Sequence, residues 1–558
     1  MKIAIAQLDY HVGNFELNTS KIIESIKKAK SEQADLVLFA ELAICGYPPR
    51  DFLEFNDFIS LCDQAINEIA SHCIGIAAIV GGPHVNPSAK GKDLFNAAYF
   101  LKDGTIAKVI HKTLLPNYDV FDEYRYFEPN RVFECIELNG SKIALTICED
   151  LWNVSGKWNG IAGQARNDGK SLYIDNPMDH LILEKPDIAV NIAASPFSYT
   201  HDEARTKVLQ KNASTYNIPF FYVNHTGAQT ELIFDGCSTV VNPEGNVWKM
   251  APFKEDLQYF ELDNIKKGID SQVYDKNNKY ELIYNALVIG ISDYFNKLGF
   301  KKAVLGMSGG IDSAVVLALA VKALGKENVL PVLLPSPYSS EGSKLHSLEM
   351  IKNLGTDHQI IPIEKGMLAY DEMLSKVFEG KAADLTEENI QARIRGGILM
   401  AMTNKLNLIL LNTSNKSEIA VGYSTLYGDS IGAISVLGDV YKTEVYALAT
   451  YINSVQGNCI PLSIIQKAPS AELRPGQKDA DSLPPYDILD PILFQYIELR
   501  QGPKEIIAQG YDPTLVYRIC KLVNMSEYKR FQAPPILRVS DKSFGFGRRL
   551  PIVAKYLG

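Results

Sequence analysis

The sequence has few cysteines for its length, and they show no pairing pattern. Only 8 of 558 residues are cysteine, and no two of them form a Cys-x-x-Cys pair. Disulfide scaffolds and structural zinc sites need dense or regularly spaced cysteines. The cysteines therefore indicate neither class, and we expect most of these thiols to be reduced, buried and unreactive.

The sequence also lacks an excess of positive charge and any long hydrophobic run. Lysine and arginine number 56 against 65 acidic residues, a formal net charge of -9, so the chain has no basic footprint for nucleic acid. No apolar run reaches the roughly 18 residues of a membrane span, and the first residues, 1–18, do not read as a signal peptide. We expect a soluble, cytoplasmic protein whose partners are small molecules.

The chain is too long for one ordinary hydrophobic core. Cores stop growing at roughly 250 to 300 residues, so 558 residues predict two domains. The best boundary is the polar stretch that follows an apolar segment at 259–262. We predict a first domain over 1–263, a linker over 264–279 and a second domain over 280–558.

In the first domain, short apolar strands alternate with amphipathic helices. Three of the predicted strands, at 36–40, 106–110 and 142–147, are followed closely by Glu41, Lys112 and Cys148. Loops on a rigid sheet are where proteins present chemical groups. A thiolate attacks an amide carbonyl, a lysine nearby lowers the thiol pKa and stabilises an oxyanion, and a carboxylate serves as general base and acid. Three strand ends can thus converge on one hydrolytic site.

The second domain begins with longer helices between apolar strands. The pattern predicts a helix over 280–298, a strand over 303–306, a helix over 313–324 and a strand over 329–334, typical of a doubly wound parallel sheet. Between the first strand and the second helix lies the glycine-rich run Ser308–Ser313. Glycines there let backbone N–H groups approach an anion, and the helix N-terminus favours it. The run matches neither the lysine-containing P-loop nor G-x-G-x-x-G.

This run resembles the SGGxDS loop of the PP-loop ATP pyrophosphatases. The resemblance implies an enzyme that cleaves ATP between its α and β phosphates while adenylating an acyl oxygen. It assigns ATP binding to Gly306, Met307, Ser308, Gly309, Gly310, Ile311, Asp312, Ser313 and Thr413.

Later motifs are similar to those of NAD synthetases. They include ENIQARIR from 388, NTSNKSE from 412, GYSTLYGD from 422, KAPSAELRPGQ from 467 and DSLPPYDILD from 481. This resemblance implies deamido-NAD as a substrate and Mg²⁺ as the metal, which hard oxygen ligands suit. It places deamido-NAD near Asn389, Arg393, Glu418, Tyr423, Asp429 and Lys542, and the metal at Asp312 and Glu418.

Glu41, Lys112 and Cys148, in that order, resemble the Glu-Lys-Cys triad of the nitrilase superfamily. The resemblance implies a four-layer αββα sandwich for the first domain, ahead of the doubly wound α/β domain. It also implies that Tyr118, Ser195 and His201 line a glutamine pocket, with His201 where family members often carry lysine.

A nitrilase-type amidase joined to a PP-loop synthetase resembles the glutamine-dependent NAD synthetases. The resemblance implies glutamine hydrolysis at Cys148, internal transfer of ammonia, and amidation of adenylated deamido-NAD to give NAD, AMP, diphosphate and glutamate. It favours a homo-oligomer. Two alternatives stay open at this stage: a hydrolase whose second domain only senses nucleotides, and an ammonia-dependent synthetase whose first domain is structural.

Overall fold

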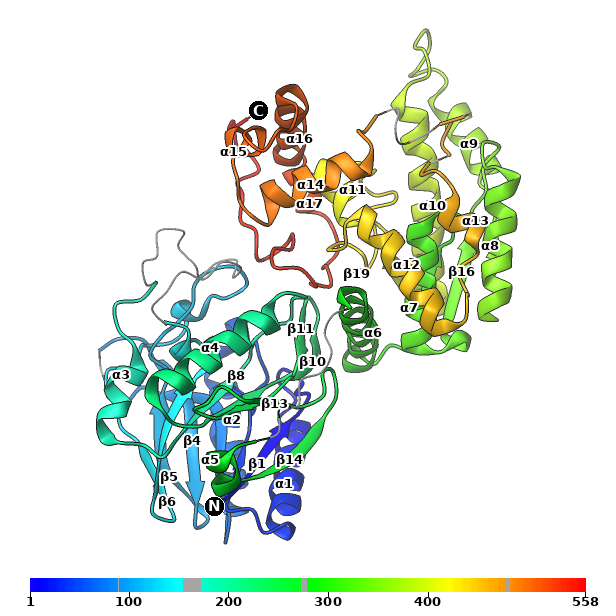
Figure 1. Ribbon diagram of the computed structural model, residues 1–558. Coiled ribbons are helices and arrows are strands. Elements are labelled where there is room, and N and C mark those ends of the chain that lie inside the picture. Colours follow the sequence, from blue (N-terminus) through cyan, green and yellow to red (C-terminus); the bar gives the residue numbers. More distant parts are fainter. Residues whose placement is uncertain are drawn as a thin grey trace. The chain divides into compact units, whose positions relative to one another are not determined.

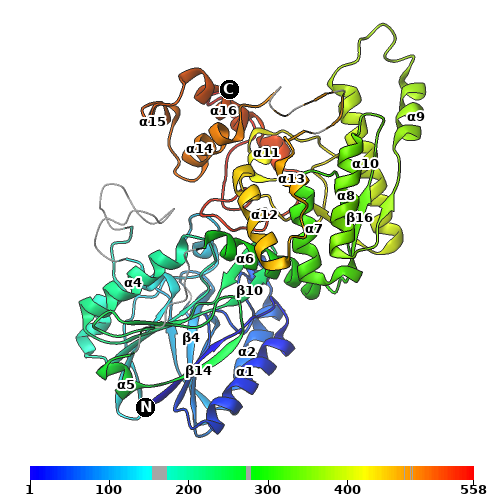
Figure 2. The same cartoon turned by 45° about the vertical axis from the view of Figure 1, so that its right-hand side comes forward.

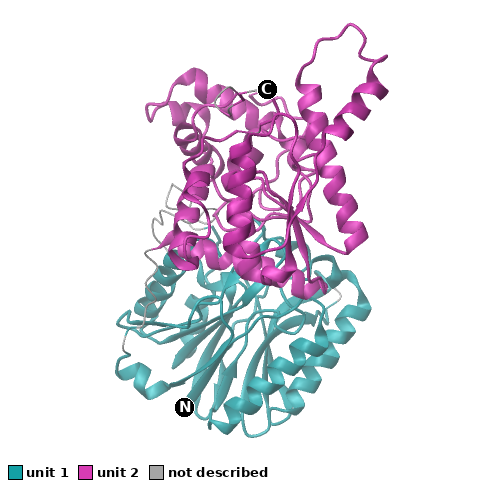
Figure 3. Cartoon of the chain, turned by 90° about the vertical axis from the view of Figure 1, so that its right-hand side faces the viewer, with its two compact units in different colours: residues 1–277 teal, residues 278–558 magenta. Residues whose placement is uncertain are grey.

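The computed structural model of the protein consists of two compact units. It describes residues 1–88, 90–153, 172–269, 271, 278–470, 472–474, 476–477, 479 and 482–557. The units comprise residues 1–277 and 278–558 (Figure 3). The division falls inside the predicted linker, of which residues 270 and 272–277 lie outside the described residues. The helix α5 (Leu262–Lys267) begins the stretch that we assigned to that linker and still packs on the first unit.

The described residues of the first unit form two six-stranded sheets. The first sheet has the order β14-β1-β2-β3-β4-β5 and the second the order β13-β12-β9-β8-β7-β6. The strands of the first sheet are β1 (Lys2–Gln7), β2 (Leu36–Leu38), β3 (Ala77–Val85), β4 (Leu94–Lys102), β5 (Thr105–His111) and β14 (Asp256–Glu261). Those of the second are β6 (Ile136–Leu138), β7 (Ser141–Ile147), β8 (Ile188–Ala193), β9 (Phe220–Asn224), β12 (Thr239–Val241) and β13 (Val247–Lys249). A separate hairpin joins β10 (Thr226–Gln229) to β11 (Leu232–Asp235).

Side chains that alternate along the strands join these sheets and their helices into four layers. On β1, Ile3 and Ile5 enter the core that the first sheet shares with the second. Ala4 and Ala6 enter a different core, shared with the helices α1 (Phe15–Ser31) and α2 (Asn56–Ser71). The helices α3 (Pro177–Leu181) and α4 (His201–Tyr216) cover the second sheet (Figure 1). The predicted αββα sandwich is confirmed.

In the part of the second unit that the structure describes, the sheet is five-stranded and all-parallel. Its order is β17-β16-β15-β18-β19, with β15 (Ala303–Gly306), β16 (Val329–Leu333), β17 (Gln359–Ile360), β18 (Ile409–Asn412) and β19 (Ile434–Ser435). Because the chain order reverses between β15 and β18, the carboxyl ends of these two strands border a crevice. Open α/β sheets bind their ligands in this crevice, and the predicted doubly wound fold is confirmed.

Helices cover both faces of this sheet (Figure 2). The helix α7 (Ile311–Leu324) is apolar all round and buried over most of its length, because it lies between the sheet and the helices α6 (Lys279–Leu298) and α12 (Lys442–Gln456). Leu399 of α10 (Leu385–Leu406) packs with Val304 and Leu410 of the strands. The remaining helices before residue 470 are α8 (Glu341–Leu354), α9 (Glu364–Leu374), α10 (Leu385–Leu406), α11 (Lys416–Val421) and α13 (Leu462–Gln466).

The C-terminal helices form a small cluster around α11. They are α14 (Tyr486–Ile497), α15 (Pro503–Ile507), α16 (Pro513–Met525) and α17 (Glu527–Arg530). Their buried side chains share one core with Ile419 and Val421 of α11. Among the described residues, no helix combines the length and hydrophobicity needed to cross a bilayer.

Candidate active sites

Cys148 lies at a sharp turn at the carboxyl end of β7. The strand ends at Ile147 and is followed by a short 3-10 turn, 148–151, and not by an α-helix. Cys148 has a left-handed φ of 43° and is only 5% exposed. All eight cysteines are free thiols, and Cys135 is the one that is only half-buried.

The carboxylate of Asp150 connects this turn to the chain that follows Lys112. Its Oδ2 accepts the N–H of Ile147 at 3.0 Å, while its Oδ1 accepts the N–H groups of Thr113 at 3.0 Å and Leu114 at 2.8 Å. One buried side chain therefore fixes the two strand ends that carry Cys148 and Lys112.

Lys112 is completely buried between two glutamates. Its Nζ lies 2.6 Å from Glu41 Oε1, and 3.0 and 2.7 Å from the two carboxylate oxygens of Glu123. We did not predict Glu123 from the sequence. It begins a short 3-10 turn, Glu123–Arg125, in which Tyr124 and Arg125 are exposed, so its burial follows no local pattern. Only the need of a buried lysine for a second carboxylate could have pointed to it.

Glu41 is held in one orientation by three donors. Its Oε1 accepts Asn96 Nδ2 at 2.7 Å as well as Lys112, and its Oε2 accepts the N–H of Ala194 at 2.9 Å. The backbone of Glu41 can lie this close to β3 only because residue 81 is a glycine: a Cβ on Gly81 would stand 2.7 Å from the Cα of Glu41. The predicted triad residues therefore do meet at one place, with Asn96 and Glu123 beside them.

The charges around Cys148 act on its pKa in opposite directions. Burial raises the pKa of the Cys148 thiol well above 9.0, and the Glu41 carboxylate raises it further, whereas the Lys112 ammonium lowers it. Burial raises the pKa of Glu123 to about 7, although Lys112 opposes this shift. Burial lowers the pKa of Lys112, but the carboxylates of Glu123 and Glu41 outweigh it and raise that pKa. At neutral pH the resting site thus holds a thiol beside an ammonium ion.

The predicted glutamine-pocket residues form two hydrogen-bonded pairs near the turn. The Tyr118 hydroxyl donates to the carboxylate of Glu149 at 3.0 Å, next to Cys148 in sequence. Ser195 Oγ lies 3.0 Å from His201 Nε2, and Ser195 directly follows Ala194, whose N–H holds Glu41. Sequence motifs did not identify Glu149, although it adjoins the proposed nucleophile.

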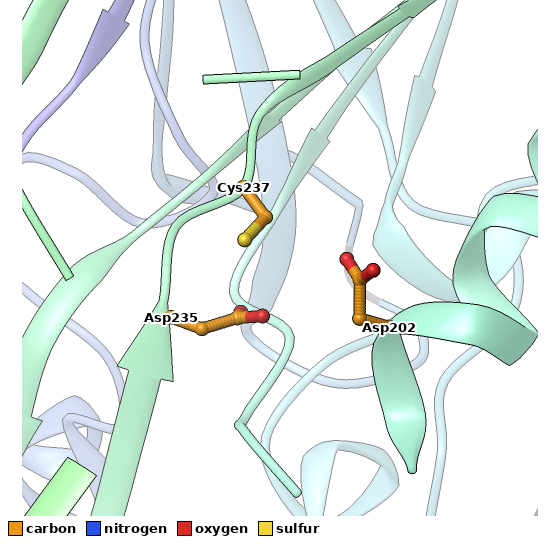
Figure 4. A group of neighbouring side chains, drawn as sticks. All are labelled: Asp202, Asp235 and Cys237. Atoms are coloured by element: carbon orange, nitrogen blue, oxygen red, sulfur yellow. The ribbon is translucent and has the colours of Figure 1, made fainter. Parts of the chain in front are cut away.

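Buried ion pairs fix the first turn of α4, where His201 stands. Asp202, Asp235 and Cys237 converge on one space, with ligand atoms within 4.8 Å of one another (Figure 4). Such a group would suit a metal ion, but two cations already neutralise its carboxylates. Arg205 Nη2 lies 2.8 Å from Asp202 and 2.7 Å from Asp235, and Lys249 Nζ lies 2.6 Å from Asp202. We therefore interpret this group as structural.

In the second unit, the crevice between β15 and β18 opens into a cavity of about 310 Å³. The cavity is lined by most of the predicted ATP residues, namely Gly306, Met307, Ser308, Gly310, Ile311, Asp312 and Thr413, but not by Gly309 and Ser313. Gly309 has a φ of 78°, and a Cβ there would lie 2.5 Å from Ser343 O. Ser313 Oγ donates to Gly310 O at 3.0 Å and so shapes the loop.

The two predicted metal ligands share a cation. Lys442 Nζ lies 2.5 Å from Asp312 Oδ2 and 3.2 Å from Glu418 Oε1, and Asn415 Nδ2 donates to Asp312 Oδ1 at 2.9 Å. Burial raises the pKa of Glu418 to about 7, while Lys442 opposes this shift. Two carboxylates that converge on one positive group are a donor set that fits Mg²⁺. We did not predict Lys442, which follows a tyrosine at a helix start and carries no motif of its own.

Most of the predicted deamido-NAD residues gather beside α10. Thr425 Oγ1 donates to Asn389 Oδ1 at 2.8 Å, and Arg393 Nε donates to Leu426 O at 3.2 Å. Tyr423 and Asp429 line the cavity together with Glu418. Asn389, Arg393 and Lys542 do not line it. In the motifs KAPSAELRPGQ and DSLPPYDILD, residues 471, 475 and 481 lie outside the described residues.

The folds and sites define a two-part enzyme, with an amidase in the first unit and a nucleotide-dependent synthetase in the second. The carbon-nitrogen hydrolase family matches residues 2–158, and the NAD synthase family matches residues 283–533. A glutamine-dependent NAD(+) synthetase of Synechocystis is 44% identical over 99% of both chains. That of Thermotoga maritima is 37% identical over 100% of this chain and 99% of its own.

Solved structures show the same relationship. The glutamine-dependent NAD(+) synthetase of Acinetobacter baumannii, in complex with ADP, is 36% identical and has a TM-score of 0.76, covering 99% of this chain and 98% of its own. That of Cytophaga hutchinsonii, at 19% identity and a TM-score of 0.82, shares the fold over 100% of this chain and 98% of its own. The chain belongs to the glutamine-dependent NAD(+) synthetases. It is a ligase that combines a glutaminase domain with an ATP-dependent NAD synthase domain, which excludes both alternatives left open by the sequence.

Proposed function

We propose that Glu41, Lys112 and Cys148 carry out the glutaminase half of the reaction. Because burial keeps the Cys148 thiol protonated, attack on the glutamine amide carbon needs a base that takes the proton during the attack. Glu41 takes it, and the Lys112 ammonium stabilises the oxyanion that forms. Glu41 then gives the proton to the leaving nitrogen, and ammonia departs from a γ-glutamyl thioester. Water, deprotonated by Glu41, hydrolyses the thioester to glutamate and the free thiol.

The fixed position of Lys112 is the observation that carries this proposal. Its ammonium is held by Glu41 on one side and Glu123 on the other, with no exposure to water. Asn96 and Glu123 act as positioning residues. Tyr118, Ser195 and His201 line the pocket for the amino acid, in which the α-carboxylate of glutamine needs a hydrogen-bond donor.

In the second domain, the loop 306–313 and the N-terminus of α7 bind the phosphates of ATP, with Thr413 at the opposite strand end. Binding of ADP by the Acinetobacter baumannii relative supports this assignment. Asn389, Arg393, Glu418, Tyr423, Asp429 and Lys542 bind deamido-NAD. The nicotinate carboxylate attacks the α-phosphate, diphosphate leaves, and ammonia then displaces AMP from the adenylate to give the amide of NAD.

Asp312 and Glu418 would hold Mg²⁺, which supplies charge neutralisation at the phosphates when it is bound. Lys442 neutralises the same carboxylates in the absence of the metal. Ammonia released into neutral water becomes mostly ammonium, which has no lone pair for the attack. It therefore passes between the two sites inside the protein.

The protein works in the cytoplasm as a homo-oligomer. The use of ATP as a substrate supports the proposed location in the cytoplasm. Of the residues of α9, none is buried, and Leu368, Met373 and Tyr370 expose large apolar side chains that a second copy would cover. Sedimentation equilibrium tests the assembly: a monomer at micromolar concentration contradicts it.

A coupled assay tests the division of labour. NAD formation is measured with deamido-NAD and Mg-ATP, using glutamine or ammonium chloride as the nitrogen source. The variant Cys148→Ala is expected to lose the glutamine-driven reaction and to keep the ammonium-driven one. Cys135→Ala, which removes the half-buried thiol, serves as the control and keeps both. Loss of both reactions in folded Cys148→Ala would contradict the proposal.

A further inference from the structure

Lys416 is a buried cation that takes no part in the cavity. It is the first residue of α11, is 0% exposed and does not line the ATP cavity. Its Nζ donates to Ser540 Oγ and to the carbonyl of Lys542, each at 2.8 Å. It also pairs with Glu498, and it lies 2.8 Å from Asp439 Oδ1. A buried ammonium is stable only with such a full set of partners.

Asp439 and Glu498 bind the same stretch of chain as Lys416. Asp439 Oδ2 accepts the N–H groups of Val539 at 2.8 Å and Ser540 at 2.7 Å, and Ser540 Oγ donates to Asp439 Oδ1 at 2.8 Å. Glu498 Oε2 accepts the N–H of Lys542 at 3.0 Å. Residues 539–542, which we call the C-terminal segment, are thus held by three buried charged side chains.

The four residues 415–418 face two directions. Asn415 donates to Asp312, and Glu418 pairs with Lys442, so both face the ATP cavity. Between them, Lys416 reaches the C-terminal segment, and Ser417 Oγ donates to Asp490 Oδ1 at 2.6 Å. One short stretch therefore carries the proposed metal ligand on one side and anchors the segment of Lys542 on the other.

We propose that Lys416 is a positioning residue for the amidation reaction. Its contacts with Asp439, Glu498 and the C-terminal segment hold Lys542 where it binds deamido-NAD. This inference rests on the role proposed above for Lys542. Without Lys416, the two buried carboxylates face each other uncompensated, and the segment loses its two bonds to the ammonium.

The test uses the full-length double variant Lys416→Met/Glu498→Gln. It removes one positive and one negative charge, so the net charge of the cluster is unchanged, and the new amide side chain keeps an acceptor for the N–H of Lys542. Steady-state kinetics are measured with ammonium as the nitrogen source. The KM for deamido-NAD is expected to rise at least about tenfold, the change that corresponds to losing one charge-assisted hydrogen bond. The KM for ATP and the glutaminase rate are expected to stay at wild-type values.

A milder variant covers the case in which the double variant fails to fold. Ser540→Ala removes the hydroxyl that joins Lys416 to Asp439 and leaves every charge in place. A smaller rise in the KM for deamido-NAD, about threefold, is expected, again with an unchanged KM for ATP. Lys297→Met, which breaks a pair with Asp293 on α6 at 3.6 Å, is the matched control and leaves both constants unchanged.

The variant Lys542→Met distinguishes a failure of the role proposed for Lys542 from a failure of the role proposed for Lys416. If this variant keeps the wild-type KM for deamido-NAD, the role proposed for Lys542 is wrong. If it raises that KM while the folded Lys416 or Ser540 variants do not, the positioning role of Lys416 is wrong. A parallel rise in the KM for ATP would also overturn the inference, because it would mean that the cavity wall itself had moved.

Discussion

The ammonium of Lys112 lies 2.6 Å from the carboxylate of Glu41, and neither side chain is exposed to water. Glu123 holds the same ammonium from the other side. The charge that we propose to stabilise the oxyanion is thereby in place before glutamine arrives, and such a preorganised charge needs no reorganisation when the oxyanion forms. Replacing Lys112 is therefore expected to change both the rate of glutamate release and the free energy of unfolding.

Replacing Lys112 by methionine is expected to reduce glutamate release at least about 100-fold, because the oxyanion loses its fixed charge. The free energy of unfolding is expected to fall by about 3–5 kcal/mol, because two buried carboxylates lose their partner. Glutaminase assays and urea unfolding measure the two effects. The control is Lys108→Met, a lysine on β5 whose side chain is 34% exposed. A Lys112 variant as active as this control would refute the role.

Gly309→Ala is expected to abolish NAD formation from either nitrogen source while glutamate release continues. The added Cβ would stand 2.5 Å from Ser343 O in a left-handed backbone and would force the phosphate loop to move. Gly299→Ala is a matched control, because Gly299 has a similar φ of 76° but open space around it. It is expected to cost only about 1 kcal/mol of stability. Equal ATP affinity in the two variants would speak against the loop as the phosphate site.

Removal of Mg²⁺ with EDTA is expected to stop NAD formation from ammonium and leave glutamate release intact. Asp312→Asn is expected to do the same at saturating Mg²⁺, because the neutral amide is a poorer ligand for a hard cation. Calorimetric titration with Mg²⁺ in the presence of ADP provides a readout other than activity. Asp293→Asn, on α6, is the control. Undiminished Mg²⁺ binding by Asp312→Asn would show that the metal is held elsewhere.

His201→Lys is expected to lower the KM for glutamine severalfold. A lysine at this position adds a permanent charge near Ser195 that can pair with the α-carboxylate of glutamine. The rate of the ammonium-driven reaction is expected to stay the same. The measurement is the glutamine dependence of glutamate release, and a KM equal to or above that of the wild type would mean that the carboxylate lies away from residue 201.

Glu231 provides a pH-dependent prediction outside the sites. Burial raises its pKa from 4.5 to about 7, although Arg50 opposes the shift. Between these pH values the folded state binds more protons than the unfolded state, so this glutamate makes the protein less stable as pH rises. Glu231→Gln lacks this penalty and is expected to gain about 1–3 kcal/mol over the wild type at pH 8 but nearly nothing at pH 4.5. Urea unfolding at the two pH values checks it, and a gain that is equal at both would be inconsistent with it.

The elements with strong local patterns were predictable from the sequence. The strand 303–306 has the predicted bounds, and α7 begins at Ile311, two residues before its predicted start. The convergence of Glu41, Lys112 and Cys148 was predictable only from their places at strand ends and from the resemblance of their order to a known triad, because β2 and β5 lie in one sheet and β7 in the other. Glu123, Glu149 and Lys442 were not, because their burial depends on contacts with residues far away in the chain. Lys542 does not line the cavity. The order of the motifs along the sequence could not predict this, because it does not give the distance of a motif from the cavity.

Asp150 accepts N–H groups from both the Cys148 turn and the chain after Lys112. This one carboxylate therefore sets the spacing between the strand ends that carry Cys148 and Lys112, and a shift of one end is expected to displace the other. Attempts to redesign this enzyme for a different nitrogen donor should leave Asp150 unchanged. They should begin instead with Ser195 and His201, which we propose to line the glutamine pocket.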